Sequence, residues 1–457
     1  MLNKSYWQTV EFERQPSLVG DISCTYAIIG AGLCGLMCAF ELTERGVSGG
    51  DIVIIDADRV CSGASACTTA KLTVQHGLIY DRLIREYGQK NAQQYMNINR
   101  AAVSRVRRIV EEHHIDCDLQ TCRSLVYASK AESVGRIAAE AAAVERLGLR
   151  AQLTDETELP FKVQLAVALD GQAKFHPLKF AGAIYDILME RGCRFYEQTT
   201  ATAIRGGSVI TAEGQIHSQK IIVSSHYPFA DMRGLHFAKL YQRRSYVLAI
   251  ENAAAIEDNY YCCDGDPVSF RGAGDTLLIA GASRKCGDQN DFGSLYSLIE
   301  KVCQIYPECM VVARWANQDV MSYAHLPVIG PIGHLDSNVM IATAFNRWGM
   351  TTSVAAAGIL ADMLTLGTKE PEIVSPARHI NRRTAAGFVR QMGEIATEFA
   401  TDLTSPRCSH MGCPLHFNAA DGTWDCPCHG SRFDTDGNVL HGPAKKYAKI
   451  DKDPPLR

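Results

Sequence analysis

The sequence predicts an α/β protein in three parts: a nucleotide-binding domain, a second domain on a mixed or antiparallel sheet, and a short all-β unit at the C-terminus. Residues 26–55 read as strand, glycine turn, helix and strand, and strand-like runs follow one another over 199–283. Four cysteines and three histidines gather in residues 408–429. The length of 457 residues agrees with about three domains of roughly 150 residues each.

The composition is that of an ordinary folded chain. Hydrophobic residues at 46% and charged residues at 21% exclude a disordered or fibrous protein. No apolar run reaches the ~18 residues of a membrane span, and the N-terminus lacks the apolar core of a secretory signal. We therefore expect a cytoplasmic protein with no membrane contact. A net charge of −4 gives no reason to expect a nucleic-acid partner. Most of the 17 cysteines are expected to be free thiols or metal ligands.

The turn Gly30-Ala31-Gly32-Leu33-Cys34-Gly35 matches G-x-G-x-x-G between the strand at 26–29 and the helix at 36–45. Its glycines permit a tight turn, the approach of a pyrophosphate and close helix–strand packing. Asp56 lies 21 residues past Gly35 at the end of the next strand, where a carboxylate can accept hydrogen bonds from ribose hydroxyls. The motif predicts a dinucleotide site but does not separate FAD from NAD.

The remaining elements follow from periodicity and turn residues. We expect helices over 80–115 (on the surface), 131–147, 177–191 and 293–306, and strands within 199–226 and over 309–316. Gly272-Ala273-Gly274 predicts a hairpin turn, because no third glycine or helix follows it. No second dinucleotide motif is present, which disfavours a separate NAD(P)H domain. Residues 367–407 are expected to form a helical linker.

The segment VIIDADRVCSGASACTTAKLTVQHG (53–77) resembles the second flavin-binding stretch of the D-amino-acid-oxidase-like FAD oxidoreductases. Residues 199–228 and 325–353 resemble later segments of that family, which usually has aspartate where Ala324 stands here. The resemblance implies FAD bound in a discontinuous domain (18–80, 192–230 and 318–366), with a substrate domain at 81–191 and 231–317. The implied FAD-binding residues are Gly30, Gly32, Gly35, Asp56, Gly63, Ala64, Ser65, Thr68, Thr69, Lys71 and, facing the flavin ring, Gly349.

Near the C-terminus, Cys408-x-His410 and Cys426-x-x-His429 are separated by fifteen residues. This is the spacing of a Rieske [2Fe–2S] centre, in which two thiolates hold one iron and two imidazoles hold the other. Zinc is the alternative, since cysteine and histidine pairs also suit a tetrahedral site. It does not account for the flanking Met411-Gly412-Cys413, Gly430-Ser431 and Gly442-Pro443-Ala444, which resemble the Rieske family.

The Rieske resemblance carries further expectations. The branch found in cytochrome bc complexes implies a disulfide between Cys413 and Cys428, with two free thiols as the alternative. Phe433 stands where high-potential members have tyrosine, so only Ser431 can donate to a ligand sulfur, and we expect a middle or low potential. Residues 408–457 are short for this domain, so it should rest against the flavin domain. His416 and His441 fall outside the ligand pattern and are expected in surface positions or loops.

The two resemblances together imply an FAD-dependent oxidoreductase that acts on a small molecule, an amine or amino acid. Its electrons would pass one at a time through the cluster to a redox partner protein. The alternative is an electron carrier or redox sensor without such a substrate, and a third possibility is an empty cluster unit with only a structural role. Candidate catalytic residues are Gln75, His76, Arg271 and Arg347. The alternatives are a structural hydrogen bond for His76, a solvated surface position for Arg271 and, for Tyr246, the core.

Overall fold

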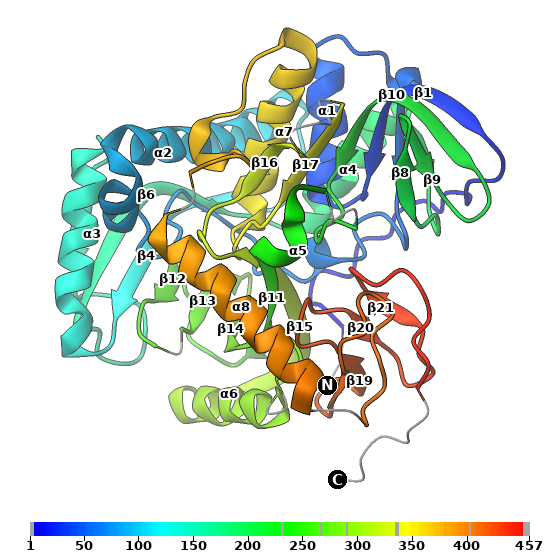
Figure 1. Cartoon of the computed structure of the whole chain (residues 1–457). Coiled ribbons are helices and arrows are strands. Elements are labelled where there is room, and N and C mark those ends of the chain that lie inside the picture. Colours follow the sequence, from blue (N-terminus) through cyan, green and yellow to red (C-terminus); the bar gives the residue numbers. More distant parts are fainter. Residues whose placement is uncertain are drawn as a thin grey trace.

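The computed structural model describes residues 4–229, 233–265, 267–288, 291–333, 338–379, 381–401 and 404–450. Its first sheet has eight strands in the order β16-β17-β10-β1-β2-β7, with β9 paired to β10 and β8 to β9 (Figure 1). Strands β7, β2, β1, β10 and β17 run parallel. The bounds are β1 Ile22–Ile29, β2 Ile52–Ile55, β7 Arg194–Tyr196, β8 Ala203–Arg205, β9 Ser208–Ile210, β10 Gln215–Val223, β16 Val328–Pro331 and β17 Val339–Thr343.

Helices cover this sheet. Helix α1 (Leu33–Glu44) packs against α7 (Gly349–Leu366) and α4 (Pro177–Glu190), and α2 (Tyr80–Glu112) packs against α7. The prediction that α2 lies on the surface is wrong for one of its faces, which buries Leu83, Met96 and Val103. Its apolar residues recur at helical spacing, so they form a stripe that faces the core.

Helix α7 is, within the described part of the chain, the one helix long and apolar enough to cross a membrane. However, 56% of that stretch is buried inside the protein. Its contacts with α1 and α2 account for the apolar composition, because a core helix of a globular domain can be equally long and apolar.

The second sheet has nine strands in the order β15-β11-β14-β13-β12-β4-β6-β3, with β5 paired to β6. Most pairs are antiparallel and β12/β4 is parallel, so the predicted mixed sheet is confirmed. The hairpin β13/β14 turns at Gly274 as expected. The strand bounds are β3 Lys71–Leu72, β4 Gln120–Ala128, β5 Gln152–Thr154, β6 Leu165–Lys174, β11 Leu240–Glu251, β12 Asn259–Cys262, β13 Ser269–Ala273, β14 Thr276–Lys285 and β15 Met310–Ser322.

Three helices accompany the second sheet: α3 (Val134–Arg146), α5 (His236–Lys239) and α6 (Asp291–Ile305). Strand β3 and the end of β15 pair in this sheet, although they fall within the segments assigned to the FAD-binding domain. The domain boundaries therefore stay a prediction.

The C-terminal unit is a four-stranded antiparallel sheet in the order β18-β19-β20-β21, preceded by α8 (Arg382–Thr401). Its strands are β18 His416–Asn418, β19 Thr423–Asp425, β20 Arg432–Phe433 and β21 Val439–His441. Its core is small, and the principal members are Leu415, Trp424 and Phe433. So small a core gives little stability alone, and the unit lies against β11 and β15 (Figure 1).

Candidate functional site

The glycine turn after β1 leaves no room for side chains. Gly30 has φ +105°, and a Cβ there would lie 2.7 Å from the carbonyl oxygen of Ser224. At Gly35 a Cβ would lie 1.9 Å from the carbonyl oxygen of Gly30. Only glycine lets β1, the turn and α1 pack this closely, and the turn opens directly onto the first turn of α1. This is the geometry that receives a dinucleotide phosphate.

Asp56 and the 63–65 loop complete the surroundings of this turn. The Asp56 carboxylate accepts hydrogen bonds from the amides of Ala31 (2.7 Å) and Asp58 (2.9 Å). Burial raises the pKa of Asp56 to about 6, and the two amides act against that rise. Ser65 Oγ accepts from the Leu33 amide at 2.9 Å, so the loop lies over the start of α1. The acid at the end of β2 fits the ribose of FAD, and the glycine turn beside it fits the pyrophosphate.

A pocket extends from this loop toward the second sheet. Its empty volume is about 710 Å³, part of it open to solvent. Its walls come from the loop after β2, strands β11, β14 and β15, and the start of α7. The main lining residues are Thr68, Thr69, Lys71, Ser245, Val247, Asn317, Asp319, Arg347, Trp348 and Met350. Just before α7, Ala344, Asn346 and Arg347 all have positive φ, between 52° and 76°. Such strain in non-glycine residues clusters at functional sites.

Two titratable groups in the pocket have displaced pKa values. Burial, reinforced by the Arg271 charge, lowers the pKa of Lys71 to about 7, and its Nζ donates to Thr69 Oγ1 and Ser269 Oγ. Burial raises the pKa of Asp319 to about 6 against the opposing pull of Arg347. Asp319 falls outside the strand that the sequence predicts, which ends at residue 316, whereas β15 continues to Ser322. The signal that could have pointed to Asp319 is an acidic residue inside a strand longer than the one predicted.

The four catalytic candidates occupy different environments. His76 is buried and neutral, since burial lowers its pKa to about 3. Its Nδ1 pairs with the Tyr95 hydroxyl (2.7 Å) and its Nε2 with the Thr73 carbonyl (2.9 Å), while its ring stacks on Trp348. Gln75 Nε2 donates to the Gly77 carbonyl and to Glu140. Both side chains make hydrogen bonds within the protein. For His76 this agrees with the alternative of a structural hydrogen bond.

The two candidate arginines, Arg271 and Arg347, also lie in different environments. Arg271 is 3% exposed, lies over the Trp7 ring at 4.8 Å and donates to the Phe175 carbonyl at 2.8 Å. Its surface alternative is therefore wrong, because the aromatic ring and the carbonyl hold the guanidinium inside. Arg347 lines the pocket and donates to the Ser283 hydroxyl. Tyr246 is buried in a hydrophobic cluster, as expected of a core residue.

The predicted cluster ligands converge in the C-terminal unit. The Cys408 thiol has the Cys426 thiol and the Ser431 hydroxyl as neighbours. The rings of His410 and His429 lie 5.0 Å apart. The Cys426 thiol and burial both raise the pKa of Cys408, because two adjacent buried thiolates repel one another unless a cation lies between them. Two thiols and two imidazoles on facing loops fit the donor set of a Rieske cluster.

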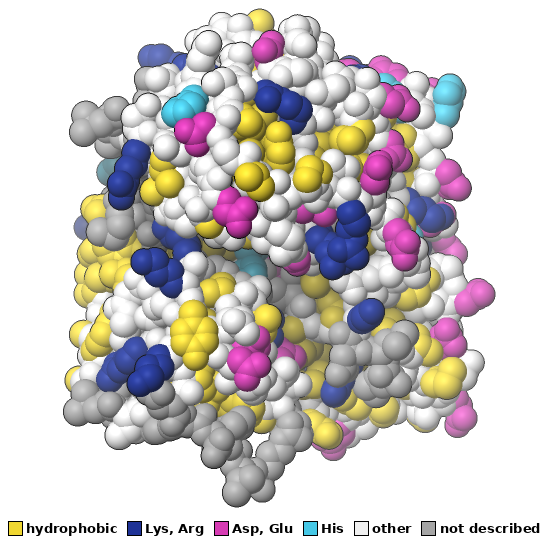
Figure 2. All heavy atoms as spheres, turned by 90° about the vertical axis from the view of Figure 1, so that its right-hand side faces the viewer, with side chains coloured by type: hydrophobic (Ala, Val, Ile, Leu, Met, Phe, Trp, Pro, Cys, Tyr) yellow, Lys and Arg dark blue, Asp and Glu magenta, His cyan; other side chains and the backbone are white. Residues whose placement is uncertain are grey.

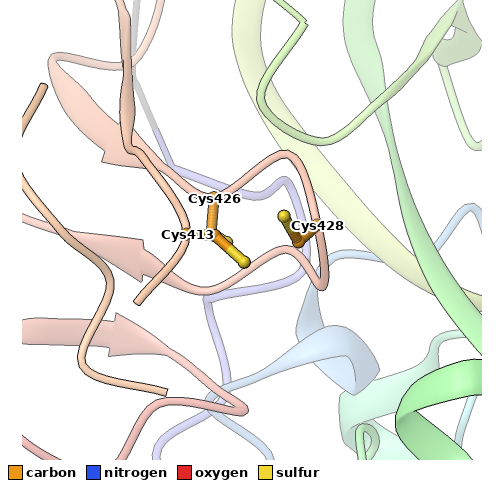
Figure 3. A group of neighbouring side chains, drawn as sticks. All are labelled: Cys413, Cys426 and Cys428. Atoms are coloured by element: carbon orange, nitrogen blue, oxygen red, sulfur yellow. The ribbon is translucent and has the colours of Figure 1, made fainter. Parts of the chain in front are cut away.

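Cys413 and Cys428 lie beside these ligands. Figure 3 shows the side chains of Cys413, Cys426 and Cys428 turned toward one another, and their Sγ atoms lie within 4.8 Å. Cys413 and Cys428 are free thiols in this structure rather than a disulfide. The predicted bond is thus not formed here, although the two thiols are neighbours, and it stays a prediction.

The second cluster loop is fixed to the second sheet. Gln242 Nε2 donates to the His429 carbonyl and Gln318 Nε2 to the Gly430 carbonyl, each at 2.6 Å. Arg244 and Asp425, both fully buried, form an ion pair at 2.5 Å. His429 Nε2 lies 3.2 Å from the Phe237 carbonyl. The side of the cluster unit that carries His429 thus faces the rest of the protein.

His416 and His441 also belong to this interface, so their predicted surface or loop positions are wrong. His416 Nδ1 lies 2.7 Å from the Gly287 carbonyl, and its Nε2 lies 3.3 Å from Glu398. His441, in β21, pairs with Gln242 Oε1 at 3.2 Å. Local sequence patterns cannot predict contacts between segments that lie so far apart in the sequence.

The pocket and the cluster unit lie on opposite faces of the same two strands. Register pairs Arg244 with Gln318 and Ser245 with Asn317. Because side chains alternate along a strand, Arg244 and Gln318 point to the cluster unit, whereas Ser245 and Asn317 line the pocket. One layer of sheet therefore separates the two sites.

Comparison with known proteins supports both the flavin-binding part and the C-terminal cluster unit. The family model of FAD dependent oxidoreductases of the DAO type matches residues 25–363, and the Rieske [2Fe-2S] domain model matches residues 395–451. YhfW of Bacillus subtilis, named as a Rieske 2Fe-2S iron-sulfur protein, is 32% identical over 98% of both chains. Gamma-glutamylputrescine oxidoreductase of Escherichia coli is 24% identical over 75% of this chain and 84% of its own.

Among solved structures, glycine oxidase from Geobacillus kaustophilus superposes with a TM-score of 0.65 at 19% identity, covering 79% of this chain and all of its own. That likeness shows the fold. The Rieske match decides between iron–sulfur and zinc in favour of the [2Fe–2S] cluster. The chain belongs to the DAO family of FAD-dependent oxidoreductases, with FAD and a C-terminal Rieske [2Fe–2S] cluster as its cofactors.

Proposed function

We propose that the protein oxidises a small amine or amino acid and passes the electrons, one at a time, through its Rieske cluster to an external acceptor. The observation that carries this proposal is the placement of the pocket and the cluster loops on opposite faces of β11 and β15. When bound, FAD supplies a hydride acceptor and the [2Fe–2S] cluster a one-electron relay. The protein contributes position and charge.

The pocket residues support a charged amine as substrate. Asp319 offers a carboxylate to an ammonium group, and Arg347 offers a guanidinium to a carboxylate. Val247, Trp348 and Met350 provide apolar walls for the carbon chain of the substrate. The names of similar proteins, gamma-glutamylputrescine oxidoreductase and glycine oxidase, point to the same substrate class.

The residue assignments belong to the proposal. The cluster ligands would be Cys408, His410, Cys426 and His429, with Cys413 and Cys428 joined beside them. FAD would lie along the glycine turn, Asp56 and the loop of residues 63–71, with its ring toward Gly349. A cytoplasmic location is supported by the free thiols elsewhere in the chain, which persist in a reducing compartment.

An electron carrier or redox sensor is the weaker alternative. A carrier between two partner proteins needs both cluster histidines exposed on one surface, whereas only the first cluster loop reaches the surface and His429 is 1% exposed and faces the flavin-binding half of the chain. A walled pocket with Arg347 at its side suits a small-molecule reaction.

An anaerobic screen of amines and amino acids tests the proposal. A substrate should bleach the flavin absorbance and then produce the EPR signal of the reduced cluster. The Cys426→Ser variant should lose the EPR signal and keep flavin bleaching. Bleaching without cluster reduction in the wild type would refute the relay, and failure of every amine and amino acid to bleach the flavin would refute the substrate class.

A further inference from the structure

We propose that Arg243 and Arg347 form an anion subsite at the outer end of the pocket, which binds a carboxylate that the substrate carries at the end remote from its reacting amine. We refer to these two guanidiniums, with the Ser283 hydroxyl between them, as the arginine pair. The inference rests on the proposed function, because it names the second functional group of the amine that the pocket would accept.

A second, wider cavity adjoins the pocket. Its empty volume is about 2120 Å³, part of it open to solvent. The two spaces are continuous, because they share the lining residues Tyr261, Pro267, Arg347 and Trp348. Asp319 lines only the inner pocket, whereas Arg243 lines only the outer cavity. A ligand that spans both spaces therefore has a carboxylate near its inner end and guanidiniums near its outer end.

The two guanidiniums converge on one serine of β14. Arg243 Nε donates to Ser283 Oγ at 3.2 Å, and its Nη2 donates to the Ser283 carbonyl at 2.7 Å. Arg347 Nη2 donates to the same Oγ. Ser283 is itself buried, so it holds both arginines from inside the protein. Two cations held at one hydroxyl repel each other, and a bound anion removes this repulsion.

The positive charge of the arginine pair is only partly balanced. In the described part of the chain neither guanidinium forms an ion pair, and Arg347 Nε is buried without a hydrogen-bond partner. Burial and the charge of Arg347 lower the pKa of Arg243, so the charge that acts most strongly on Arg243 is another cation. Asp319 is the acid on which Arg347 acts. One acid for two arginines leaves a net positive charge that an anion can neutralise.

The other acids of the outer cavity have partners of their own. Asp81 pairs with Arg85, Glu86 pairs with Arg82, Glu140 accepts from backbone amides, and Asp264 accepts from Ser129. On the outer face of the molecule shown in Figure 2, Lys and Arg side chains are interspersed with Asp and Glu side chains. The arginine pair differs from that surface in placing two like charges together inside a cavity, where the field of a charge is less screened.

A carboxylate at the outer end suits this arrangement. Guanidinium groups bind carboxylates through parallel hydrogen bonds, and two of them can hold one carboxylate. Arg243 and Asp319 lie opposite each other in the register of β11 and β15, yet they form no ion pair and line different spaces. An α-amino acid carries both charges on one carbon, whereas these residues separate the two binding groups. We therefore expect a carboxylate several bonds away from the amine.

The binding test uses valerate, which has no amine and cannot reduce the flavin. Calorimetric titration of the FAD-loaded protein should show binding, and Arg243→Met should weaken it about tenfold. Arg243→Lys keeps the charge but loses the planar fork, so it should bind between these limits. Arg108→Met, at an exposed position on α2, makes the same change of net charge outside the cavity and should bind as the wild type does. A failed amine screen leaves these results intact.

The substrate test compares δ-aminovalerate with pentylamine, which lacks the carboxylate, and with norvaline, in which amine and carboxylate share one carbon. The wild type should reduce its flavin with δ-aminovalerate at a kcat/KM about tenfold above that with pentylamine, and Arg243→Met should abolish this difference. The flavin absorbance of each variant shows whether FAD is bound, and Arg243→Lys keeps the test valid if Arg243→Met loses FAD.

Three results would overturn the proposal. The first is equal binding of valerate by the wild type and Arg243→Met. The second is faster flavin reduction by norvaline than by δ-aminovalerate, because the carboxylate would then lie beside the reacting carbon. The third is a changed flavin potential in Arg243→Met with unchanged valerate binding, because the arginine pair would then act on the flavin and not on a ligand.

Discussion

Gln242 on β11 and Gln318 on β15 clamp the second cluster loop through a shared amide pair. Gln318 Nε2 donates to Gln242 Oε1 at 2.8 Å and to the Gly430 carbonyl, while Gln242 Nε2 donates to the His429 carbonyl. Arg244 Nη2 donates to Gln318 Oε1 at 3.1 Å and extends the chain of bonds. All three side chains are buried, so each hydrogen bond forms without competition from water.

Replacing either glutamine with leucine should loosen the second cluster loop. Gln242→Leu or Gln318→Leu leaves a buried carbonyl without its donor, at a cost of about 1–3 kcal/mol. Hydrogen exchange of residues 426–431 should then accelerate, and the visible absorbance of the cluster should be lost at lower temperature. Gln152→Leu, at an exposed position on β5, is the matched control. Unchanged exchange in both variants would show that the amide pair does not hold the loop.

Removing Arg244 should destabilise the C-terminal unit through Asp425. Burial favours the neutral acid, but Arg244 and Arg432 outweigh it and hold the pKa of Asp425 below its usual range. A lowered pKa stabilises the fold above the ordinary aspartate pKa, and this contribution is lost as pH falls through the folded value.

Arg244→Met leaves the buried Asp425 carboxylate with Arg432 as its remaining cationic partner. The loss should approach the about 3–5 kcal/mol of a broken buried ion pair, and acid unfolding of the cluster unit should move to higher pH. Adding Asp425→Asn should recover part of the loss, which a double-mutant cycle on urea unfolding would measure. Identical acid unfolding in Arg244→Met and wild type would contradict this account.

Lys71 should make the stability of the fold depend on pH between about 7 and 10.5. Its pKa is about 7 in the folded protein, against an ordinary value of 10.5, because burial and Arg271 disfavour the ammonium. The unfolded chain therefore binds the proton more tightly between these values, and stability should rise with pH across this window.

Lys71→Met removes this group, so its thermal midpoint should exceed that of the wild type most below pH 7, and the difference should shrink toward pH 10. Lys130→Met, at an exposed lysine, should show no such trend. A pH-independent difference would mean that Lys71 does not titrate in this window.

Asp319 should control the use of a cationic substrate. Burial sets its pKa at about 6, so its carboxylate forms as pH rises through that value. If it binds a substrate ammonium, flavin bleaching by an amine should rise over the same range, and Asp319→Asn should flatten the profile and raise KM about tenfold or more. Asp155→Asn, at an exposed position, is the control. A rise that persists in Asp319→Asn would assign it to another group.

Local patterns predicted the elements that local sequence determines. The glycine turn, Asp56 and the two cluster loops depend on spacing within short segments, so they could be located from the sequence. Asp319 could not be located from the sequence, because its position depends on where a strand ends. The place of His441 in the interface could not be predicted either, because it depends on a contact with Gln242, 199 residues away. The burial of Arg271 beneath Trp7 likewise depends on packing between distant segments.

The alternation of side chains along β11 and β15 restricts which length changes these strands can tolerate. Inserting or deleting one residue between 242 and 247 would exchange the two faces, turning glutamine and arginine into the pocket and serine and valine toward the iron–sulfur unit. Two functions would fail together from one change that leaves composition almost untouched. The surface turn at Gly206-Gly207, outside this ribbon, has no such constraint and should accept extra residues.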